Sequence, residues 1–288
     1  MKNNSGSGLW NSSFGEIGAT LKTLEDLGVT NEHLTQIRSD PGFAKIVADV
    51  FLRGIEKPVV RLYADERVQS NRTYPPEYNG PKPIEVQIKK LAKIFNLNSK
   101  FALQYAKTLS KSPKGEGYFA IVRPGALSSV CSQAVRVALD ELKKARPNFC
   151  NYREGQIDEQ HVRLSEATGK NYEKFSQEQK GDIWIISAQL GSAYKGQSSR
   201  CVIEEFISDE FSLDAIAGIS IVLVHSERLT RYDELDMWLP GTQFSYGADG
   251  VFSRVAVLCF DDDEVRFGAI GADCPDDSFG VASGFPSS

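Results

Sequence analysis

The residues with the most chemical promise form a glycine-punctuated segment after residue 190. It reads Gly191-Ser192-Ala193-Tyr194-Lys195-Gly196-Gln197-Ser198 and lies between an expected strand, Asp182 to Ser187, and an expected short helix. This order is that of a phosphate-binding loop, but Gln197 stands where that loop requires the lysine that contacts the β- and γ-phosphates. The ninety residues after Ser198 are also too few for the α/β core that such a loop opens. We therefore do not expect nucleotide hydrolysis at this segment.

A weaker hypothesis survives for the same segment, namely a site for a small anion. Backbone N–H groups at the start of a helix attract negative charge. The residues that would bind a phosphate or a carboxylate here are Gly191, Gly196, Gln197, Ser198 and Arg200. The alternative is a tight turn in which the glycines serve only the backbone conformation.

His225 is the best catalytic candidate, because it directly follows an apolar run expected to be a buried strand, Ile216 to Val224. Glu227, Arg228 and Asp233 come close behind it. The sequence offers no nucleophile at a recognisable elbow and no partner by spacing, so a structural or capping histidine is the favoured interpretation. His161 and Ser165 stand one helical turn apart, which chance explains equally well. No catalytic residue is assigned, and no complete catalytic motif is present, so a protein without enzyme activity is favoured and an enzyme stays open as the alternative.

Metal and cofactor sites are not indicated by the remaining polar clusters. Consecutive carboxylates in Asp261-Asp262-Asp263-Glu264 cannot all turn toward one ion, and the glycine of a calcium loop is missing, so a solvated hairpin turn is favoured. The five cysteines are widely spaced without a C-x-x-C pair, which indicates buried free thiols. We expect neither a metal nor a cofactor.

The elements that must position these groups include two amphipathic helices between residues 84 and 110. In each, lysines lie opposite an apolar stripe, with a turn and N-cap at 96–99. We predict an antiparallel helix pair over 84–111 whose outer face carries four lysines, called the lysine face below: Lys89, Lys93, Lys100 and Lys107. Such a surface neutralises phosphates in a nucleic-acid complex. The alternative is an ordinary solvated face, because lysine is soluble and favours helices.

Charge is distributed very unevenly along the chain, although the net charge is only −5. Residues 58–114 carry eleven basic and four acidic groups, whereas residues 201–288 carry four basic and seventeen acidic ones. The two segments either attract one another across an internal interface or face different partners. The sequence does not choose between these arrangements.

The expected fold class is α+β, with a helical N-terminal part followed by a mixed part with a mostly antiparallel C-terminal sheet. Helices are expected from Thr20 to Leu27, from Thr30, and from Asp40-Pro41 onward, and then at Leu127 to Ala145 and Asp158 to Gln177. Strands are expected at Tyr118 to Val122, Asp182 to Ser187, Ile216 to Val224, Arg254 to Phe260 and Glu264 to Phe267, the last two as a hairpin. The helices at 20–39 have helix-turn-helix spacing. The second of them has one basic residue, Arg38, beside the acidic Glu32 and Asp40, so a plain helical hairpin is favoured over a DNA-binding motif.

Domain organisation follows from the proline pattern. Four prolines fall within residues 74–83, which excludes regular structure and makes 75–83 the expected linker. The expected parts are a flexible N-terminus at 1–15, a helical region at 16–74, the linker, and an α+β domain at 84–288. Residues 1–13 lack the apolar stretch of a signal peptide, and the longest apolar run, Ala215 to Val224, is too short to span a bilayer. We expect a cytoplasmic protein with no membrane contact.

Several short strings resemble a group of uncharacterised hypothetical proteins from small-genome bacteria of candidate phyla. They are Leu24-Glu25-Asp26-Leu27-Gly28-Val29-Thr30, Lys82-Pro83-Ile84, Asn151-Tyr152-Arg153-Glu154-Gly155-Gln156, Gly181-Asp182-Ile183 and Phe279-Gly280-Val281-Ala282-Ser283-Gly284-Phe285. The resemblance covers most of the chain and implies a bacterial cytoplasmic origin, with no activity, fold or site to transfer.

Two functional hypotheses remain. The preferred one is a non-catalytic accessory protein that contacts nucleic acid weakly, and without sequence preference, through the lysine face. The other is an enzyme or sensor that binds a small anion or phosphate near 191–200. The positions of the cations favour the first, because the lysines concentrate in the helix pair while the glycine-punctuated segment has only Lys195 and Arg200 nearby.

Overall fold

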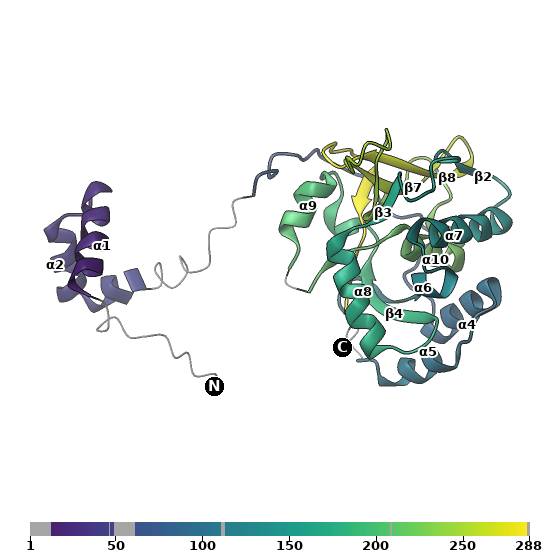
Figure 1. Cartoon of the computed structure of the whole chain (residues 1–288), viewed down its shortest axis with the longest axis horizontal. Helices are drawn as coiled ribbons and strands as arrows, with labels where there is room; N and C mark the ends of the chain where they lie inside the picture. The colour runs from purple at the N-terminus through teal and green to yellow at the C-terminus, as the bar shows by residue number, and fades with distance from the viewer. Residues whose placement is uncertain (1–12, 46, 49–60, 111–112, 208, 287–288) are drawn as a thin grey trace. The chain divides into compact units, whose positions relative to one another are not determined.

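The computed structural model describes residues 13–45, 47–48, 61–110, 113–207 and 209–286, which fall into two compact units, Met1–Val60 and Arg61–Ser288 (Figure 1). The Pro-rich segment 75–83 is irregular, as expected, but it belongs to the second unit, where Tyr78 is buried. Residues 61–74, expected in the helical region, form turns and extended chain within this same unit. The division between the units therefore comes before the segment that the proline pattern favoured.

The first unit is a helical hairpin that continues into a further helical stretch. α1 (Phe14–Asp26) ends before Gly28, whose φ of 90° is the left-handed conformation that glycine adopts without strain. α2 (Asn31–Ser39) begins after Thr30, whose backbone N–H donates to Nδ1 of His33 at 3.0 Å. Residues 41–45 and 47–48 are helical as well, whereas the end of this expected helix lies outside the described residues. The expected helices at 20–27 and from residue 30 are therefore confirmed.

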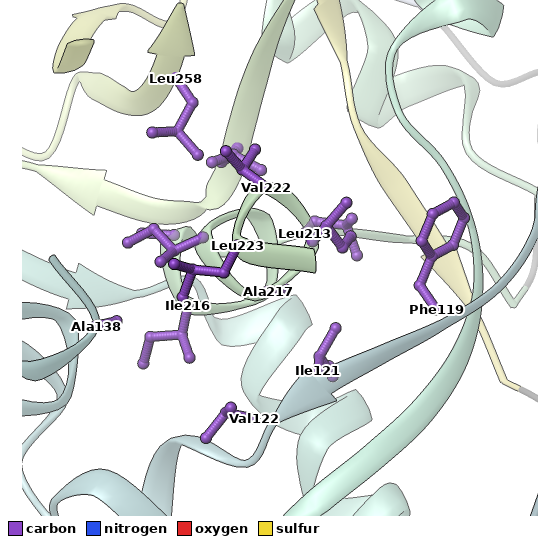
Figure 2. Packing of buried hydrophobic residues seen from close by; sticks show 14 of the residues in the cluster. Phe119, Ile121, Val122, Ala138, Leu213, Ile216, Ala217, Val222, Leu223 and Leu258 are labelled. Atoms are coloured by element: carbon purple, nitrogen blue, oxygen red, sulfur yellow. The ribbon is translucent and has the colours of Figure 1, made fainter. Parts of the chain in front are cut away.

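The core of the second unit is built around one helix, α10 (Ala215–Val224). This run was expected to be a strand, and that prediction was wrong. All ten of its residues are buried, so the run has no polar face, and periodicity cannot separate a fully buried helix from a buried strand. The Asp214 side chain starts the helix by accepting from the Ala217 N–H at 2.8 Å. Figure 2 shows α10 enclosed by apolar side chains from several elements, among them Phe119, Ile121, Val122, Ala138 and Leu258.

A four-stranded antiparallel sheet lies on one side of α10, in the order β1 (Gly117–Val122), β4 (Ile183–Gln189), β10 (Ser283–Phe285) and β5 (Phe211–Ser212). The expected strands at 118–122 and 182–187 are β1 and β4. β1 is an edge strand, and its free backbone groups are bonded by side chains of two helices. Gln87 donates to Tyr118 O at 2.9 Å and accepts from Ala120 N at 2.9 Å, and Ser220 accepts from Val122 N at 3.1 Å. This closes the edge against pairing with another chain.

A second, six-stranded sheet packs on α10 through β6 and β7. Its main path is β2 (Phe149–Asn151), β8 (Glu264–Gly271), β7 (Arg254–Asp261), β6 (Asp236–Phe244) and β3 (Val162–Leu164), with β9 (Phe279–Val281) parallel to β6. β7 and β8 form the expected hairpin, with Asp261 opposite Glu264. The two turn residues, Asp262 and Asp263, have φ of 47° and 60°, the left-handed pair that suits the twist of a two-residue hairpin loop. The fold is α+β with an antiparallel C-terminal hairpin.

The remaining helices cover these sheets. The expected helix at 127–145 starts later, as α7 (Cys131–Ala145), and Leu127 ends a separate short helix, α6 (Pro124–Leu127). The expected helix at 158–177 is shorter at its start, because residues 162–164 join β6 as β3, and α8 (Glu166–Glu178) begins after Ser165. Ser165 accepts from the Thr168 N–H and thereby caps this helix. α4 (Ile84–Phe95) packs on β1 and α10, α5 (Lys100–Tyr105) packs on β4, and α9 (Ser199–Glu205) follows the glycine-punctuated segment.

Candidate nucleic-acid interface

The orientation of α4 is determined by its buried face. Gln87, Ile88 and Leu91 are buried, and the Gln87 amide is bonded to the backbone of β1. Lys89 and Lys93 lie on the other side of the helix, one turn apart, and both are exposed. Asn96 ends the helix in the left-handed conformation, with φ of 52°.

The second helix of the expected pair is shorter than the pattern indicated. α5 ends at Tyr105 and continues as a 3-10 turn, η2 (Ala106–Thr108). Ala102 is buried, whereas Lys100 at the start of α5 and Lys107 in η2 are exposed. All four residues of the lysine face therefore point to solvent, although the expected end of the pair at residue 111 lies outside the described residues.

Two other lysines of this region are bound internally. The Lys82 ammonium donates to Val224 O at 2.8 Å, at the C-terminal end of α10, and forms an ion pair with Glu227 at 2.8 Å. Lys90 donates to the same carbonyl at 3.2 Å, and burial lowers the pKa of Lys90. A positive charge at the C-terminal end of a helix is stabilised by the helix dipole. These bonds link α4, and the chain just before it, to the end of α10.

The basic segment and the acidic C-terminal segment do contact one another. Arg61 pairs with Glu205 at 3.0 Å, Arg67 pairs with the same carboxylate, and Lys114 lies 3.4 Å from Asp209. Together with the Lys82 pair, these contacts neutralise cations that come before and after the lysine face in the sequence. In the described part of the chain, no carboxylate lies within ion-pair distance of Lys89, Lys93, Lys100 or Lys107.

The segment at 191–200 contains the expected order of elements, and its donors are bonded to groups of the protein itself. Ser198 caps α9 and donates its hydroxyl to Glu66 at 2.6 Å. Arg200 binds the same carboxylate through Nε, at 2.8 and 2.9 Å to its two oxygens, and lowers the pKa of Glu66. The carboxylate held at this helix start is therefore internal.

The two glycines of this segment are explained by close backbone packing. Gly191 has φ of 116°, and a side chain there would lie 2.8 Å from Gly280 O. Gly196 has φ of 74°, and a side chain there would meet Val68 O at 2.2 Å. The Gly196 N–H donates to Phe279 O at 3.0 Å, and Gln197 forms a β-bridge with Arg67. These glycines join the chain around 66–68 and β9 to the segment.

His225 follows a helix rather than a strand, and it ends α10 inside the core. Its side chain has no exposed surface, and neither ring nitrogen has a hydrogen-bond partner among the described residues. Tyr78 and Phe119 contact the imidazole edge to face, with ring centroids 5.9 and 5.6 Å away. Burial, reinforced by Lys82, lowers the pKa of His225 to about 4. A neutral, enclosed ring without access to substrate supports the structural interpretation.

The other polar candidates also have structural partners. Asp261, Asp262 and Glu264 all bind Arg266 across the hairpin turn. His161 contacts Asp158 at 2.7 Å ahead of β3, whereas Ser165 caps α8, so the two do not share a helix face. All five cysteines are free thiols, but only Cys201 is buried and Cys274 is exposed, so the expectation that they are all buried was wrong. No metal-binding group of three His, Cys, Asp or Glu side chains occurs among the described residues.

Several buried polar residues could not be found by sequence spacing. Arg228 has no exposed surface, donates to Leu235 O and Leu190 O at 2.6 and 3.0 Å, and stacks 4.0 Å from the Tyr74 ring. Burial raises the pKa of Asp236 to about 8. Leu190 and Tyr74 lie far from Arg228 in the sequence, and its only sequence signal was its place three residues after His225. These groups hold the core together.

No described helix has the length and apolar character needed to cross a bilayer. Comparisons of the chain with models of protein families, with curated proteins and with solved structures find no match.

Proposed function

We propose that this protein is a non-catalytic accessory protein that contacts nucleic acid weakly, and without sequence preference, through the lysine face. The observation that supports this most directly is that the basic residues of segment 58–114 include some paired with carboxylates and some exposed without such a pair. Arg61, Arg67, Lys82 and Lys114 are neutralised by acidic residues of the C-terminal segment, while the lysine face is exposed and carries no such pair within the described residues.

The composition of the helix pair supports the same proposal. Residues 84–111 contain six lysines and a single acid, Glu85. The face offers ammonium groups without arginine forks or base-reading side chains, so its contacts would be to phosphates. Affinity of this type is about 10⁻⁴–10⁻⁶ M at physiological salt and falls as salt displaces the protein.

The test is a fluorescence anisotropy titration of a labelled 30-base-pair duplex DNA at low salt. The variant Lys89→Glu/Lys93→Glu/Lys100→Glu/Lys107→Glu reverses the lysine face. A matched control reverses four exposed lysines of α7 and α8 instead, Lys143, Lys144, Lys170 and Lys174, and changes the net charge equally. We expect loss of binding in the first variant only. Absence of wild-type binding, or equal weakening by both variants, would refute the proposal.

A further inference from the structure

A second cationic surface lies at one end of the six-stranded sheet, where three arginines and two aromatic rings meet. β6 ends at Phe244, and the loop 245–253 returns the chain to β7 at Arg254. Arg163 of β3 stands opposite Gln243 at the base of this loop. Arg153 follows β2, which pairs with β8 in the same sheet (Figure 1). We call this group the arginine–aromatic cluster: Arg153, Arg163, Tyr246, Phe252 and Arg254.

Each guanidinium of the cluster stacks on a ring. Arg254 and Arg153 lie 4.7 and 5.4 Å from the centroid of Tyr246, and Arg163 lies 4.0 Å from that of Phe252. The Tyr246 side chain remains 58% exposed, although two arginines flank it. A guanidinium that packs against a ring keeps N–H groups with which it can bind a phosphate.

The charges of the cluster are not neutralised inside the protein. Arg163 donates to the Gln243 amide oxygen at 2.8 Å, Arg153 donates to Gln156 at 2.9 Å, and Arg254 donates to Ala269 O at 3.4 Å. These acceptors are neutral. Burial, and then the neighbouring Arg254, lower the pKa of Arg153, and its Nε is buried without a partner among the described residues.

Nearby residues show that this arrangement differs from an ordinary ion-pair network. Arg266 on β8 binds three carboxylates, whereas no carboxylate lies within ion-pair distance of the three arginines of the cluster in the described chain. The loop's own acid, Asp249, accepts from Ser245 Oγ at 2.9 Å and from the Val251 N–H at 3.0 Å. It shapes the loop and leaves the guanidinium groups unpaired.

We infer that the arginine–aromatic cluster binds single-stranded nucleic acid, with the arginines on phosphates and the exposed part of the Tyr246 ring against a base. Unpaired bases present π faces that a duplex hides, and base–aromatic stacking tolerates any sequence. An acidic peptide would satisfy the charges but would not use the exposed ring. This surface is separate from the lysine face, and the inference does not depend on the function proposed for those helices.

The test compares binding of a 20-nucleotide oligothymidine with binding of a duplex of the same length, using the full chain. Tyr246→Ala removes the ring, Tyr246→Phe keeps it, and Arg163→Gln removes one exposed cation. We expect Tyr246→Ala to weaken single-strand binding about tenfold or more. We expect Tyr246→Phe to retain it, and duplex binding to change little. Circular dichroism establishes that each variant is folded.

The outcomes separate this inference from the proposed function. Loss of single-strand binding in Tyr246→Ala, with no effect of the four lysine-face changes, would support the cluster and remove the lysine face. Unchanged binding in both Tyr246→Ala and Arg163→Gln, with loss in the lysine-face variant, would overturn the cluster alone. Polyglutamate competing as well as oligothymidine would also overturn it, because that result needs charge but no stacking.

Discussion

Asp214 is the residue whose replacement tests the central helix most sharply. One of its carboxylate oxygens accepts from the Ala217 N–H and from the Tyr172 hydroxyl, both at 2.8 Å, and all three residues are buried. Asp214→Ala would remove the N-cap of α10 and leave both donors without a partner. Asp214→Asn would keep an oxygen in the same place. The two variants therefore differ in the hydrogen bonds and share the loss of charge.

The magnitude follows from the two bonds. Loss of an N-cap costs about 1 kcal/mol, and a buried hydroxyl stranded without a partner costs about 1–3 kcal/mol more. We expect Asp214→Ala to lower the free energy of unfolding by about 2–4 kcal/mol relative to Asp214→Asn, out of the roughly 5–15 kcal/mol that holds a domain together. Adding Tyr172→Phe to Asp214→Ala should recover part of the loss, because no hydroxyl is then stranded.

The difference in the free energy of unfolding between Asp214→Asn and wild type should depend on pH. Burial raises the pKa of Asp214 from 3.8 to about 6, so the folded state holds the proton more tightly than the unfolded chain. The associated stability is present below pH 4 and is lost as the pH rises through 6. Asp214→Asn lacks this loss, so it should gain on the order of 3 kcal/mol relative to wild type between pH 4 and pH 8.

Urea unfolding followed by circular dichroism, at pH 4, 6 and 8, measures all of these differences. Comparing variants at each pH cancels the contributions of other titrating groups, Asp236 among them. Equal stabilities of Asp214→Ala and Asp214→Asn would refute the capping role. A difference between Asp214→Asn and wild type that stays constant with pH would refute the raised pKa of the buried carboxyl.

Three further changes test other parts of the account. His225→Phe should reduce acid sensitivity in thermal unfolding, because a pKa near 4 makes wild type lose stability as the pH falls below 6.5; an unchanged acid loss would contradict this. Glu66→Ala should free Ser198 and Arg200, so that 10 mM phosphate raises its melting temperature but not that of wild type; equal shifts would argue against the internal carboxylate. Asp263→Gly should stabilise the hairpin by about 1 kcal/mol in urea unfolding, because its φ is 60°, and more than Asp262→Gly, which also removes an Arg266 contact; the reverse order would contradict it.

Local signals in the sequence predicted local structure well. Gly28 marked the end of a helix, and the apolar stripe at 84–95 placed Lys89 and Lys93 on the outer side of α4. The acidic turn between two β-rich runs predicted the β7–β8 hairpin. Each of these features depends on neighbours within a few residues, which periodicity and turn chemistry describe.

The central helix could not be distinguished from a strand for a physical reason. A run without a single exposed residue has no polar face, so neither a period of 2 nor a period of 3.6 can appear in it. Asp214 and Gly218 were the remaining clues. Asp214 is a good N-cap, and Gly218 lets the helix approach Leu239 closely, but both are equally ordinary in a loop or a strand.

Contacts between residues far apart in the sequence could not be predicted from the spacing of residues along the chain. Glu66 binds Ser198 and Arg200 across more than 130 residues of chain. The segment alone therefore predicted an open anion site, whereas the Glu66 carboxylate already binds there. The arginine–aromatic cluster likewise joins segments from residue 153 to residue 254. The pairing of the basic and acidic segments is a third case, since only the fold decides which cations are neutralised.

The most direct test of the lysine face is the salt dependence of single-strand DNA binding. Contact of its four lysines with phosphates predicts a slope of about −3 for log K against log salt, which falls in magnitude by about 0.7 for each lysine changed to glutamine. The series Lys93→Gln, then Lys89→Gln/Lys93→Gln, then all four positions, should reduce the slope step by step. A wild-type slope that none of these changes alters would contradict the account.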